Sequence, residues 1–454
     1  EPALKKLISD AEPSGQKGKI QSLIVPHAGY AYSGQVAAAG YKSLPSRASY
    51  DNIFIIASSH REQFAGSSIY SAGNYITPLG EVKVNRDLAK NLIDSHSHLS
   101  FRPEAHDREH SIEVQLPFLQ HRFSDLPPIV PIVMGSSSVE SARDLARALL
   151  PYYTAENLFV ISSDFSHYPP YEDAVRVDRR TADAILTGDP SSFYNTLRRN
   201  SREGIPNLAT SCCGWSSILT LLYMSQNRND LVFEAIRYMN SGDAPQGDQS
   251  RVVGYWAIAA RAADPSEALL RMKPEDKDRL LTISRKTLES YLLTGDIPLI
   301  DESELPGSLT VPAGAFVSLY MGDRLRGCIG HFGASGPLYR TVQEMTLSAA
   351  TRDSRFAAVE PPELEYLRIE ISILTPLQRI RSVEEFELGR HGIYMTKDGR
   401  SGTFLPQVAE GKDWSREDFL GHCAREKAGI GWEGWKEADL YTYEAIVFGE
   451  GVKP

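Results

Sequence analysis

The feature that most constrains this chain is an alternation of short β-rich runs and helical stretches across its first half. Segments such as residues 139–150 and 179–186 have helical patterning and lie between runs of branched aliphatic residues. The strand candidates are residues 20–25, 52–57, 128–134, 157–161, 231–238 and 252–259. This alternation is typical of a mostly parallel sheet with helices on both faces. We therefore expect an α/β fold for the first half.

The sequence changes in character after residue 260. The chain has 454 residues, too many for one ordinary core, so two or three domains are expected. Charged residues and Asp-Pro and Lys-Pro steps occur over residues 261–277. We place a first domain at 1–264, a linker at 265–274 and a second domain at 275–454. The second domain is expected to be α+β, with helices at 274–294 and 337–351 and strands at 315–321, 367–374 and 443–448.

Composition excludes several classes of function. The chain has 48 basic and 58 acidic residues, a formal charge of -10, which argues against nucleic-acid binding or an anionic membrane surface. No apolar run reaches the length of a membrane span. Four cysteines without a C-x-x-C pair make a poor disulfide framework, so a reducing, cytoplasmic location is expected. The first residue is Glu1 rather than Met, so we expect the natural protein to extend further.

Metal-capable side chains follow three of the predicted strands. His27 and His60 each come directly after an apolar run, and Asp164 and His167 follow a third. In open α/β sheets ligands bind outside the carboxyl ends of the strands, where residues distant in sequence converge. A single histidine after a strand is more often an ordinary loop residue, but three at equivalent positions indicate a site.

Two neutral imidazoles need a third ligand to hold a divalent ion, and the candidates are Cys213, Asp164, His167 and Glu113. We favour Cys213 because Gly214 follows it at the start of a helix expected over 215–223, whose N-terminus would favour the thiolate. Such a His-His-Cys set leaves iron(II), copper and zinc open. The adjacent Cys212 is expected to be a buried structural residue.

Residues 106–118 place His106 and His110 one turn apart, with Glu113 on the same face if the segment is helical. We interpret His110 and Glu113 as groups that orient a metal ligand or contact the substrate. His106 is expected to be solvated, and nothing in the pattern singles out His96, His98 or His121.

The second half has one motif with polar side chains, residues 326–331 (RGCIGH), interpreted as a strand and turn whose glycines permit unusual backbone angles. Arg326 and Cys328 are expected to face a pocket. Arg352 and Arg355 would make it an anion-binding groove, because guanidinium groups match carboxylate or phosphate. An internal ion-pair network explains these arginines equally well.

Five motifs occur in order over residues 19–260: 26–34 (PHAGYAYSG), 59–60 (SH), 109–113 (EHSIE), 163–167 (SDFSH) and 213–214 (CG). Together they resemble the Memo family. The resemblance implies the fold of class III extradiol dioxygenases, whose non-haem iron is held by two histidines and a glutamate. It places His27, His60 and Cys213 on the metal-site positions, with Asp164 and His167 as the neighbouring polar pair. Cysteine in place of the dioxygenase glutamate is a departure from the ring-cleavage pattern.

The second half resembles the AMMECR domain over residues 275–454, through 325–330 (LRGCIG), 352–356 (RDSRF) and 402–408 (GTFLPQV). The two resemblances imply a fusion from the AmmeMemoRadiSam system, in which these modules occur with a radical-SAM protein. No three-cysteine radical-SAM motif is present in this sequence, so that partner would be a separate chain.

Two classes of function follow. The first is a metal-dependent, dioxygenase-like redox enzyme for a small-molecule or peptide substrate, with His167 moving a proton and Asp164 orienting it. Tyr30 and Tyr32 would line its mouth. The alternative is a non-catalytic module that uses the same cleft to bind a peptide or protein, or to handle copper or iron.

Overall fold

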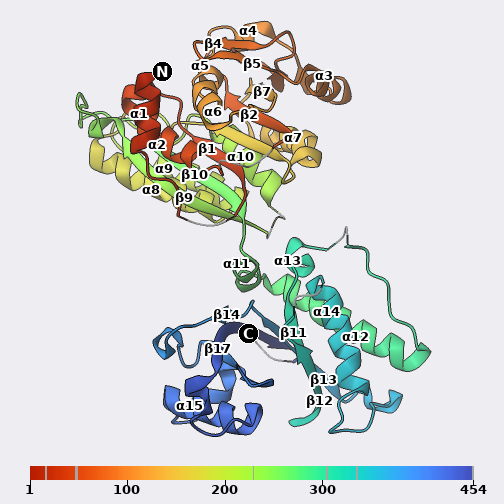
Figure 1. Cartoon of the computed structure of the whole chain (residues 1–454). Helices are drawn as coiled ribbons and strands as arrows, with labels where there is room; N and C mark the ends of the chain where they lie inside the picture. The colour runs from red at the N-terminus through yellow and green to blue at the C-terminus, as the bar shows by residue number, and fades with distance from the viewer. Residues whose placement is uncertain are drawn as a thin grey trace. The chain divides into compact units, whose positions relative to one another are not determined.

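The computed structural model describes residues 1–15, 18–45, 50–226, 228, 230–302, 305–333 and 336–451. The chain forms two compact units, Glu1–Ala262 and Ala263–Pro454 (Figure 1). The predicted linker at 265–274 contains helix α11 (Pro265–Leu270), whose Leu269 is buried in the core of the second unit. None of the helices in the described part of the chain combines the length and apolar character that crossing a bilayer requires.

The first unit is built on an eight-stranded sheet with the order β6-β3-β7-β2-β8-β1-β10-β9. Its strands are β1 (Ile20–Val25), β2 (Asn52–Ser58), β3 (Ser67–Ile69), β6 (Leu99–Ser100), β7 (Ile129–Met134), β8 (Asn157–Ser162), β9 (Leu231–Asn240) and β10 (Gly254–Ala262). The central strands β7, β2, β8 and β1 run parallel to one another, and β10 and β9 add antiparallel pairs at one edge. The α/β class expected from the sequence is confirmed. A separate hairpin pairs β4 (Tyr75–Thr77) with β5 (Gly80–Val82).

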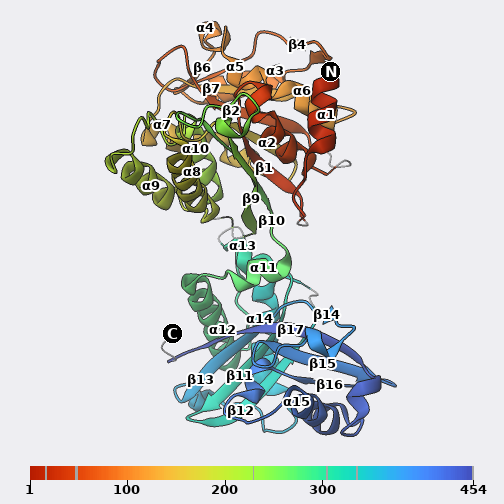
Figure 2. The same cartoon turned by 90° about the vertical axis from the view of Figure 1, so that its left-hand side faces the viewer.

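Helices cover both faces of this sheet because its central strands are apolar on both sides. Alternate residues of β2 enter opposite cores, with Phe54 in one and Ile55 in the other. Figure 2 shows the two helix groups on opposite sides of the strands. One group contains α7 (Val139–Leu149), α8 (Tyr171–Leu186), α9 (Pro190–Arg202) and α10 (Trp215–Ser225), and the other contains α1 (Pro2–Asp10), α2 (Tyr30–Lys42) and α6 (Leu116–Arg122). Helix α3 (Arg86–Ser95) packs near the β6 edge.

The single helix considered for residues 106–118 is not formed. The segment instead contains α4 (Pro103–His106) and α5 (His110–Glu113), separated by Arg108 with a φ of 61°. A left-handed residue ends one helix before the next begins. His106, His110 and Glu113 therefore do not share one continuous helix face.

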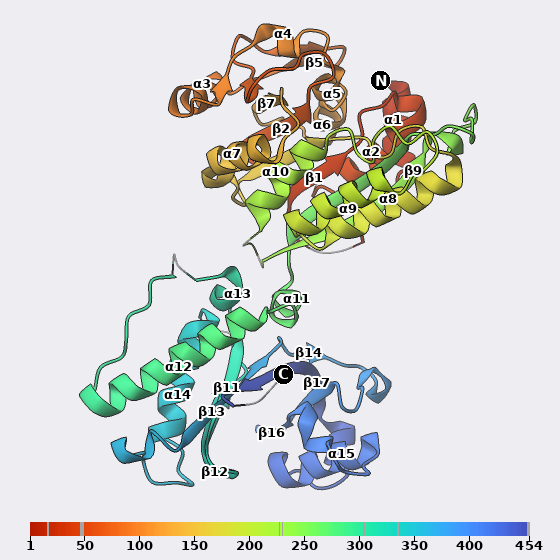
Figure 3. The same cartoon turned by 180° about the vertical axis from the view of Figure 1, so that it is seen from behind.

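The second unit is an antiparallel sheet with helices, which confirms the α+β expectation. The order β12-β11-β13-β17-β15-β16, with β14 beside β17, makes a seven-stranded sheet. Its strands are β11 (Gly314–Met321), β12 (Arg324–His331), β13 (Leu367–Leu374), β14 (Gln378–Arg379), β15 (His391–Lys397), β16 (Arg400–Phe404) and β17 (Asp439–Gly449). Its other helices are α12 (Pro274–Thr294), α13 (Gly307–Thr310), α14 (Leu338–Thr351) and α15 (Arg416–Cys423), and Figure 3 shows α12 and α14 against β11 and β13.

The glycines of the RGCIGH motif do not adopt unusual backbone angles, contrary to the sequence interpretation. Gly327 lies within β12, and its φ is not positive. A Cβ at this position would lie 2.2 Å from the carbonyl oxygen of Ala349 in α14. Glycine is therefore needed for close packing of strand on helix rather than for a turn.

Candidate metal centre

Three parallel strands deliver the candidate residues to one edge of the first sheet. The order β2-β8-β1 makes these strands neighbours, so the residues just beyond their carboxyl ends meet at the same edge. His27 follows β1, His60 follows β2, and Asp164 and His167 follow β8. Cys213 joins them from the loop before α10, where its N–H donates to the carbonyl oxygen of Asp164 at 3.2 Å.

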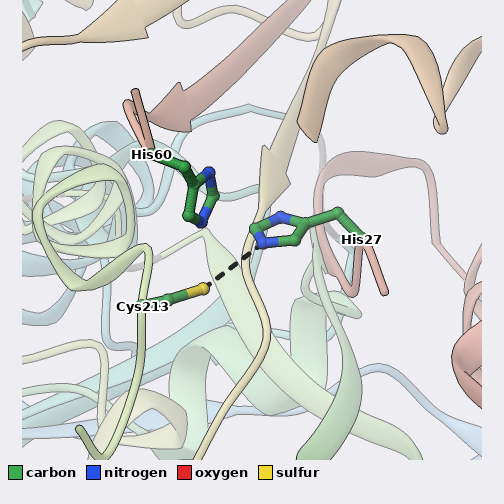
Figure 4. A group of neighbouring side chains, drawn as sticks. All are labelled: His27, His60 and Cys213. Atoms are coloured by element: carbon green, nitrogen blue, oxygen red, sulfur yellow. Dashed lines mark hydrogen bonds between the residues drawn. The ribbon is translucent and has the colours of Figure 1, made fainter. Parts of the chain in front are cut away.

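The structure brings the three predicted ligands together. One ligand atom from each of His27, His60 and Cys213 lies within 4.8 Å of the other two. His27 Nε2 is 3.4 Å from Cys213 Sγ, and the two imidazole rings meet edge to face at 4.9 Å (Figure 4). His27 is buried, with 3% of its surface exposed, so a ligand would reach it from the His60 side, which is more open.

Hydrogen bonds determine which nitrogen of His27 is free. Its Nδ1 lies 3.0 Å from Ser162 Oγ. Ser162 donates its hydroxyl proton to the carbonyl oxygen of Ser111 at 2.6 Å and accepts from Gln115 Nε2 at 2.9 Å. Since its one proton is already used, Ser162 accepts from His27 Nδ1–H. Nε2 then carries the lone pair and points toward Cys213.

His60 is oriented in the same way by a carboxylate. Its Nδ1 lies 3.0 Å from Glu109 Oε1, and its backbone N–H donates to Glu109 Oε2 at 2.8 Å. Burial raises the pKa of Glu109, but hydrogen bonds from His60 and Ser111 outweigh it and bring the pKa to about 2. The carboxylate accepts, so His60 donates through Nδ1 and keeps Nε2 free for a metal. The bond to Glu109 also raises the pKa of His60.

In both imidazoles Nδ1 is bonded to an acceptor and Nε2 is left available next to a thiol, which fits a transition-metal ion. Burial lowers the pKa of His27 to about 4, which keeps the ring neutral and able to coordinate. Imidazole nitrogen and cysteine sulfur together suit iron, copper or zinc better than calcium or magnesium. The donor chemistry is therefore consistent with the predicted metal set.

The expectation that a helix N-terminus favours the Cys213 thiolate is wrong for the metal-free protein. Burial raises the pKa of Cys213 well above its usual value, and the carboxyl of Asp164 adds to the effect. Desolvation outweighs the helix dipole here, so deprotonation would require a metal ion. The adjacent Cys212 is fully buried beside Ser163 Oγ at 3.0 Å, as expected for a structural cysteine.

Asp164 and His167 line the same region in different ways. Asp164 is buried, and its Oδ1 accepts from the backbone N–H groups of His27 at 2.8 Å and Ala28 at 3.2 Å. It thereby fixes the loop that carries His27. Burial lowers the pKa of His167, which interacts electrostatically with Asp164 and His60, and its Nε2 has no hydrogen-bond partner among the described residues.

The four residues predicted to contact the substrate in the first unit differ in their surroundings. His110 lies beside the site, with its ring 5.5 Å from that of His27 and 5.3 Å from that of His60. Tyr32 is 37% exposed, but the Tyr30 hydroxyl donates to the carbonyl oxygen of Val114 at 2.8 Å and anchors α2. Glu113 is exposed and does not belong to either group of neighbouring metal-capable side chains.

Sequence reasoning did not select Glu109, Ser162 or Gln115, which orient the two imidazoles. Glu109 was visible only as a neighbour of His110 in the EHSIE segment, and nothing in the sequence distinguishes Ser162 from other strand-end serines. Contrary to the expectation from the sequence, His106 is not solvated. Its Nε2 lies 3.0 Å from Ser68 Oγ, and burial lowers its pKa to about 4.

In the second unit the arginines of the RGCIGH and RDSRF segments form internal ion pairs. Arg326 holds Glu363 through two bonds of 2.8 and 3.0 Å, and Arg355 holds Asp353 through bonds of 2.9 and 2.7 Å. Asp353 also accepts from the N–H of Cys328 at 2.8 Å. These contacts match the ion-pair alternative, while the anion-binding groove with the exposed Arg352 stays a prediction.

The comparisons with known proteins agree with the resemblances noted in the sequence. The Memo-like protein family matches residues 1–259, and the AMMECR1 family matches residues 281–448. A MEMO1 family protein of Thermoplasma acidophilum is 36% identical over 247 residues, covering 54% of this chain and 86% of that protein. A MEMO1 family protein of Desulfurococcus amylolyticus is 36% identical over 238 residues, covering 52% and 81%.

Among solved structures, an uncharacterized protein from Pyrococcus horikoshii shares 30% identity with a TM-score of 0.37, over 40% of this chain and 94% of that one. Both family matches fall within the two structural units, and the motif residues around His27, His60 and Cys213 lie in the first. The chain therefore belongs to the Memo family through residues 1–259 and carries an AMMECR1 domain in residues 281–448.

Proposed function

We propose that residues 1–262 form a metal-dependent, dioxygenase-like redox enzyme in which His27, His60 and Cys213 hold iron(II) or copper, with zinc as the alternative ion. The observation that carries this proposal is the pairing of each Nδ1 with a fixed acceptor. Ser162 and Glu109 leave both Nε2 atoms directed toward one thiol. When bound, an iron or copper ion supplies Lewis acidity and one-electron redox chemistry.

The protein's own residues would bind the substrate and move its proton. His167 has a nitrogen without a hydrogen-bond partner among the described residues and is neutral by burial, so it can accept a proton from a bound hydroxyl. Asp164 interacts electrostatically with the resulting imidazolium. Tyr32 and His110 are exposed enough to contact a small-molecule or peptide substrate. Tyr30 contributes by anchoring α2 rather than by donating to the substrate.

A separate radical-SAM protein is proposed as a partner, supported by the fusion of a Memo unit with an AMMECR1 domain. Copurification from cells with the wild-type chain would test the association. The Arg352→Ala variant would test whether this exposed arginine of the AMMECR1 domain takes part in it. Recovery of no radical-SAM protein with the full chain would contradict the association.

The metal proposal predicts a specific pattern of metal loss. After anaerobic purification, elemental analysis should find about one transition-metal ion per wild-type chain, and at least roughly tenfold less in His27→Ala and Cys213→Ser. Cys212→Ser is the matched control, because that thiol is buried outside the cluster. Unchanged metal content in both site variants would refute the assigned ligands. Tight copper(I) binding without oxygen consumption would instead favour the metal-handling alternative.

A further inference from the structure

Next to the candidate metal centre lies an aromatic residue in a backbone conformation that aromatic residues rarely adopt. Tyr168 has a φ of 75°, in the left-handed region that strains a bulky side chain. Its N–H donates to the carbonyl oxygen of Val252 at 2.6 Å. The preceding His167 forms backbone bridges to Thr210 and Val253. The loop is therefore held in the strained conformation by hydrogen bonds to two other segments.

In this conformation the Tyr168 ring lies beside both His167 and Arg251. The ring centroids of Tyr168 and His167 are 5.5 Å apart, and the guanidinium carbon of Arg251 lies 4.0 Å from the centroid of the Tyr168 ring. We call His167, Tyr168 and Arg251 the rim row. Its inner end is at the candidate metal centre, because His167 follows Asp164 by three residues and Asp164 Oδ2 lies 3.9 Å from His27 Nε2. Its outer end is open, since Tyr168 is 38% exposed and Arg251 is also exposed.

Arg251 has no acidic partner in the described part of the chain. The nearest acid in sequence, Asp248, accepts from the N–H and hydroxyl of Ser250 at 2.8 and 2.9 Å. Stacking on an aromatic face orders a guanidinium without using its N–H donors. The donors of Arg251 are therefore available, and their planar fork matches a carboxylate or a phosphate.

The two ends of the rim row carry different polar groups. At the inner end, the buried carboxyl of Asp164 already accepts from the backbone N–H groups of His27 and Ala28. Arg251 offers a positive charge at the other end of the rim row. Strained backbone conformations persist only where the surrounding structure enforces them, and they occur often at binding sites.

We propose that the substrate of the metal centre carries a carboxylate or a phosphate group, and that Arg251, held in place by Tyr168, binds this group. The inference rests on the proposed function and names its substrate class. The anionic group sits at the outer end of the rim row, and the rest of the substrate extends past His167 toward His27, His60 and Cys213. Arg251 thus favours molecules that carry an anionic group at one end. When Arg251 binds that group, the neutral end of the molecule faces the metal.

The test uses the zinc-loaded full chain, since zinc does not change oxidation state, with three aromatic probes of similar size. Catechol is neutral, 3,4-dihydroxybenzoate carries a carboxylate, and phenyl phosphate carries a phosphate. Calorimetry should show both anionic probes, or one of them, binding at least about tenfold tighter than catechol. The tighter of the two identifies which anion the site prefers. Arg251→Gln should remove the advantage and leave catechol binding unchanged.

Two further variants separate a direct contact from general charge. Arg199→Gln removes an exposed arginine from α9 and makes the same charge change, so it should leave all three affinities unaltered. Tyr168→Gly retains the left-handed backbone and removes the ring, so it should weaken the anionic probes several-fold. The proposal is overturned if anionic probes bind no tighter than catechol, or if Arg251→Gln and Arg199→Gln weaken them equally.

Metal content measured in the same samples separates this inference from the proposed function. Arg251→Gln should retain its zinc, because Arg251 is not a ligand. If His27→Ala also retains zinc, the proposed metal site fails, while the comparison of probes still reports on Arg251.

Discussion

Glu109 is a buried carboxylate whose hydrogen bonds decide how His60 is presented. It accepts from the ring and the backbone of His60 and from the N–H and hydroxyl of Ser111. Four donors around one carboxylate outweigh the penalty of burial, which is why its pKa falls rather than rises. A charged acceptor also increases the basicity of the imidazole that it orients.

Replacing Glu109 by Gln should weaken metal binding by about 10- to 100-fold. The amide cannot supply a charged acceptor to His60 Nδ1, so the ring loses both its fixed orientation and part of its basicity. Competition with a chromophoric chelator measures the affinity. Glu113→Gln is the control, because Glu113 is exposed and lies four residues away. Equal affinities in the two variants would show that Glu109 does not orient the ligand.

At the scale of elements, the loop after β8 is fixed to α8 by Asp178. This fully buried carboxyl accepts from the N–H and hydroxyl of Ser166 at 2.8 and 3.0 Å and from the Tyr238 hydroxyl at 2.8 Å. Gly254 makes room for it, since a Cβ there would lie 1.8 Å from Asp178 Oδ2. The segment that carries Asp164 and His167 is therefore held by a neighbouring helix.

Burial raises the pKa of Asp178 to about 7, despite the hydrogen bonds from Ser166 and Tyr238 that lower it. The unfolded chain has a pKa of about 3.9 at this residue, so the folded state binds the proton more tightly. Stability from this group is fully present below pH 4 and is lost as the pH rises toward 7.

The side chain in Asp178→Asn does not titrate. The stability of this variant relative to the wild type should therefore increase as the pH rises. We expect the difference in free energy of unfolding to shift by roughly 2–4 kcal/mol in favour of Asn between pH 4 and pH 8. Hydrogen exchange in urea, followed on peptides of the first unit, measures it. Asp183→Asn, at an exposed site on the same helix, should show no such trend. A difference that is constant with pH would contradict the pKa of Asp178.

At the scale of the whole molecule, the two units have separate hydrophobic cores. The first has one core on each face of its sheet, and the second has one core under α12 and α14 and a smaller one around α15. The candidate ligands His27, His60 and Cys213 all belong to the first unit. Metal binding is thus expected to stabilise only the first unit.

Hydrogen exchange with and without metal tests this expectation. A ligand at about 100 times its Kd stabilises the unit that binds it by about 2.7 kcal/mol. Exchange should slow in peptides that contain His27, His60 and Cys213 and remain unchanged in peptides of residues 275–451. Cys213→Ser should abolish the protection. Protection confined to the second unit would place the metal elsewhere.

Local patterns in the sequence determined the architecture and most of the site. Apolar runs matched β1, β2, β7 and β8 to within one or two residues, and the motif segments correctly indicated both families. The three candidate metal ligands could be selected from the sequence because each follows a strand or precedes a helix, and sheet topology places such positions together. These features are local, since strand and helix periodicity depends on residues a few positions apart.

Only the tertiary structure decided how those residues are presented. Which nitrogen of His27 is free depends on Ser162, Ser111 and Gln115, and the thiol pKa of Cys213 depends on how deeply it is buried. The placement of Arg251 on Tyr168 likewise follows from a contact between distant segments. Hydrogen-bond partners and desolvation depend on which elements contact one another in the folded protein. A sequence pattern with a period of two or four residues does not specify those contacts.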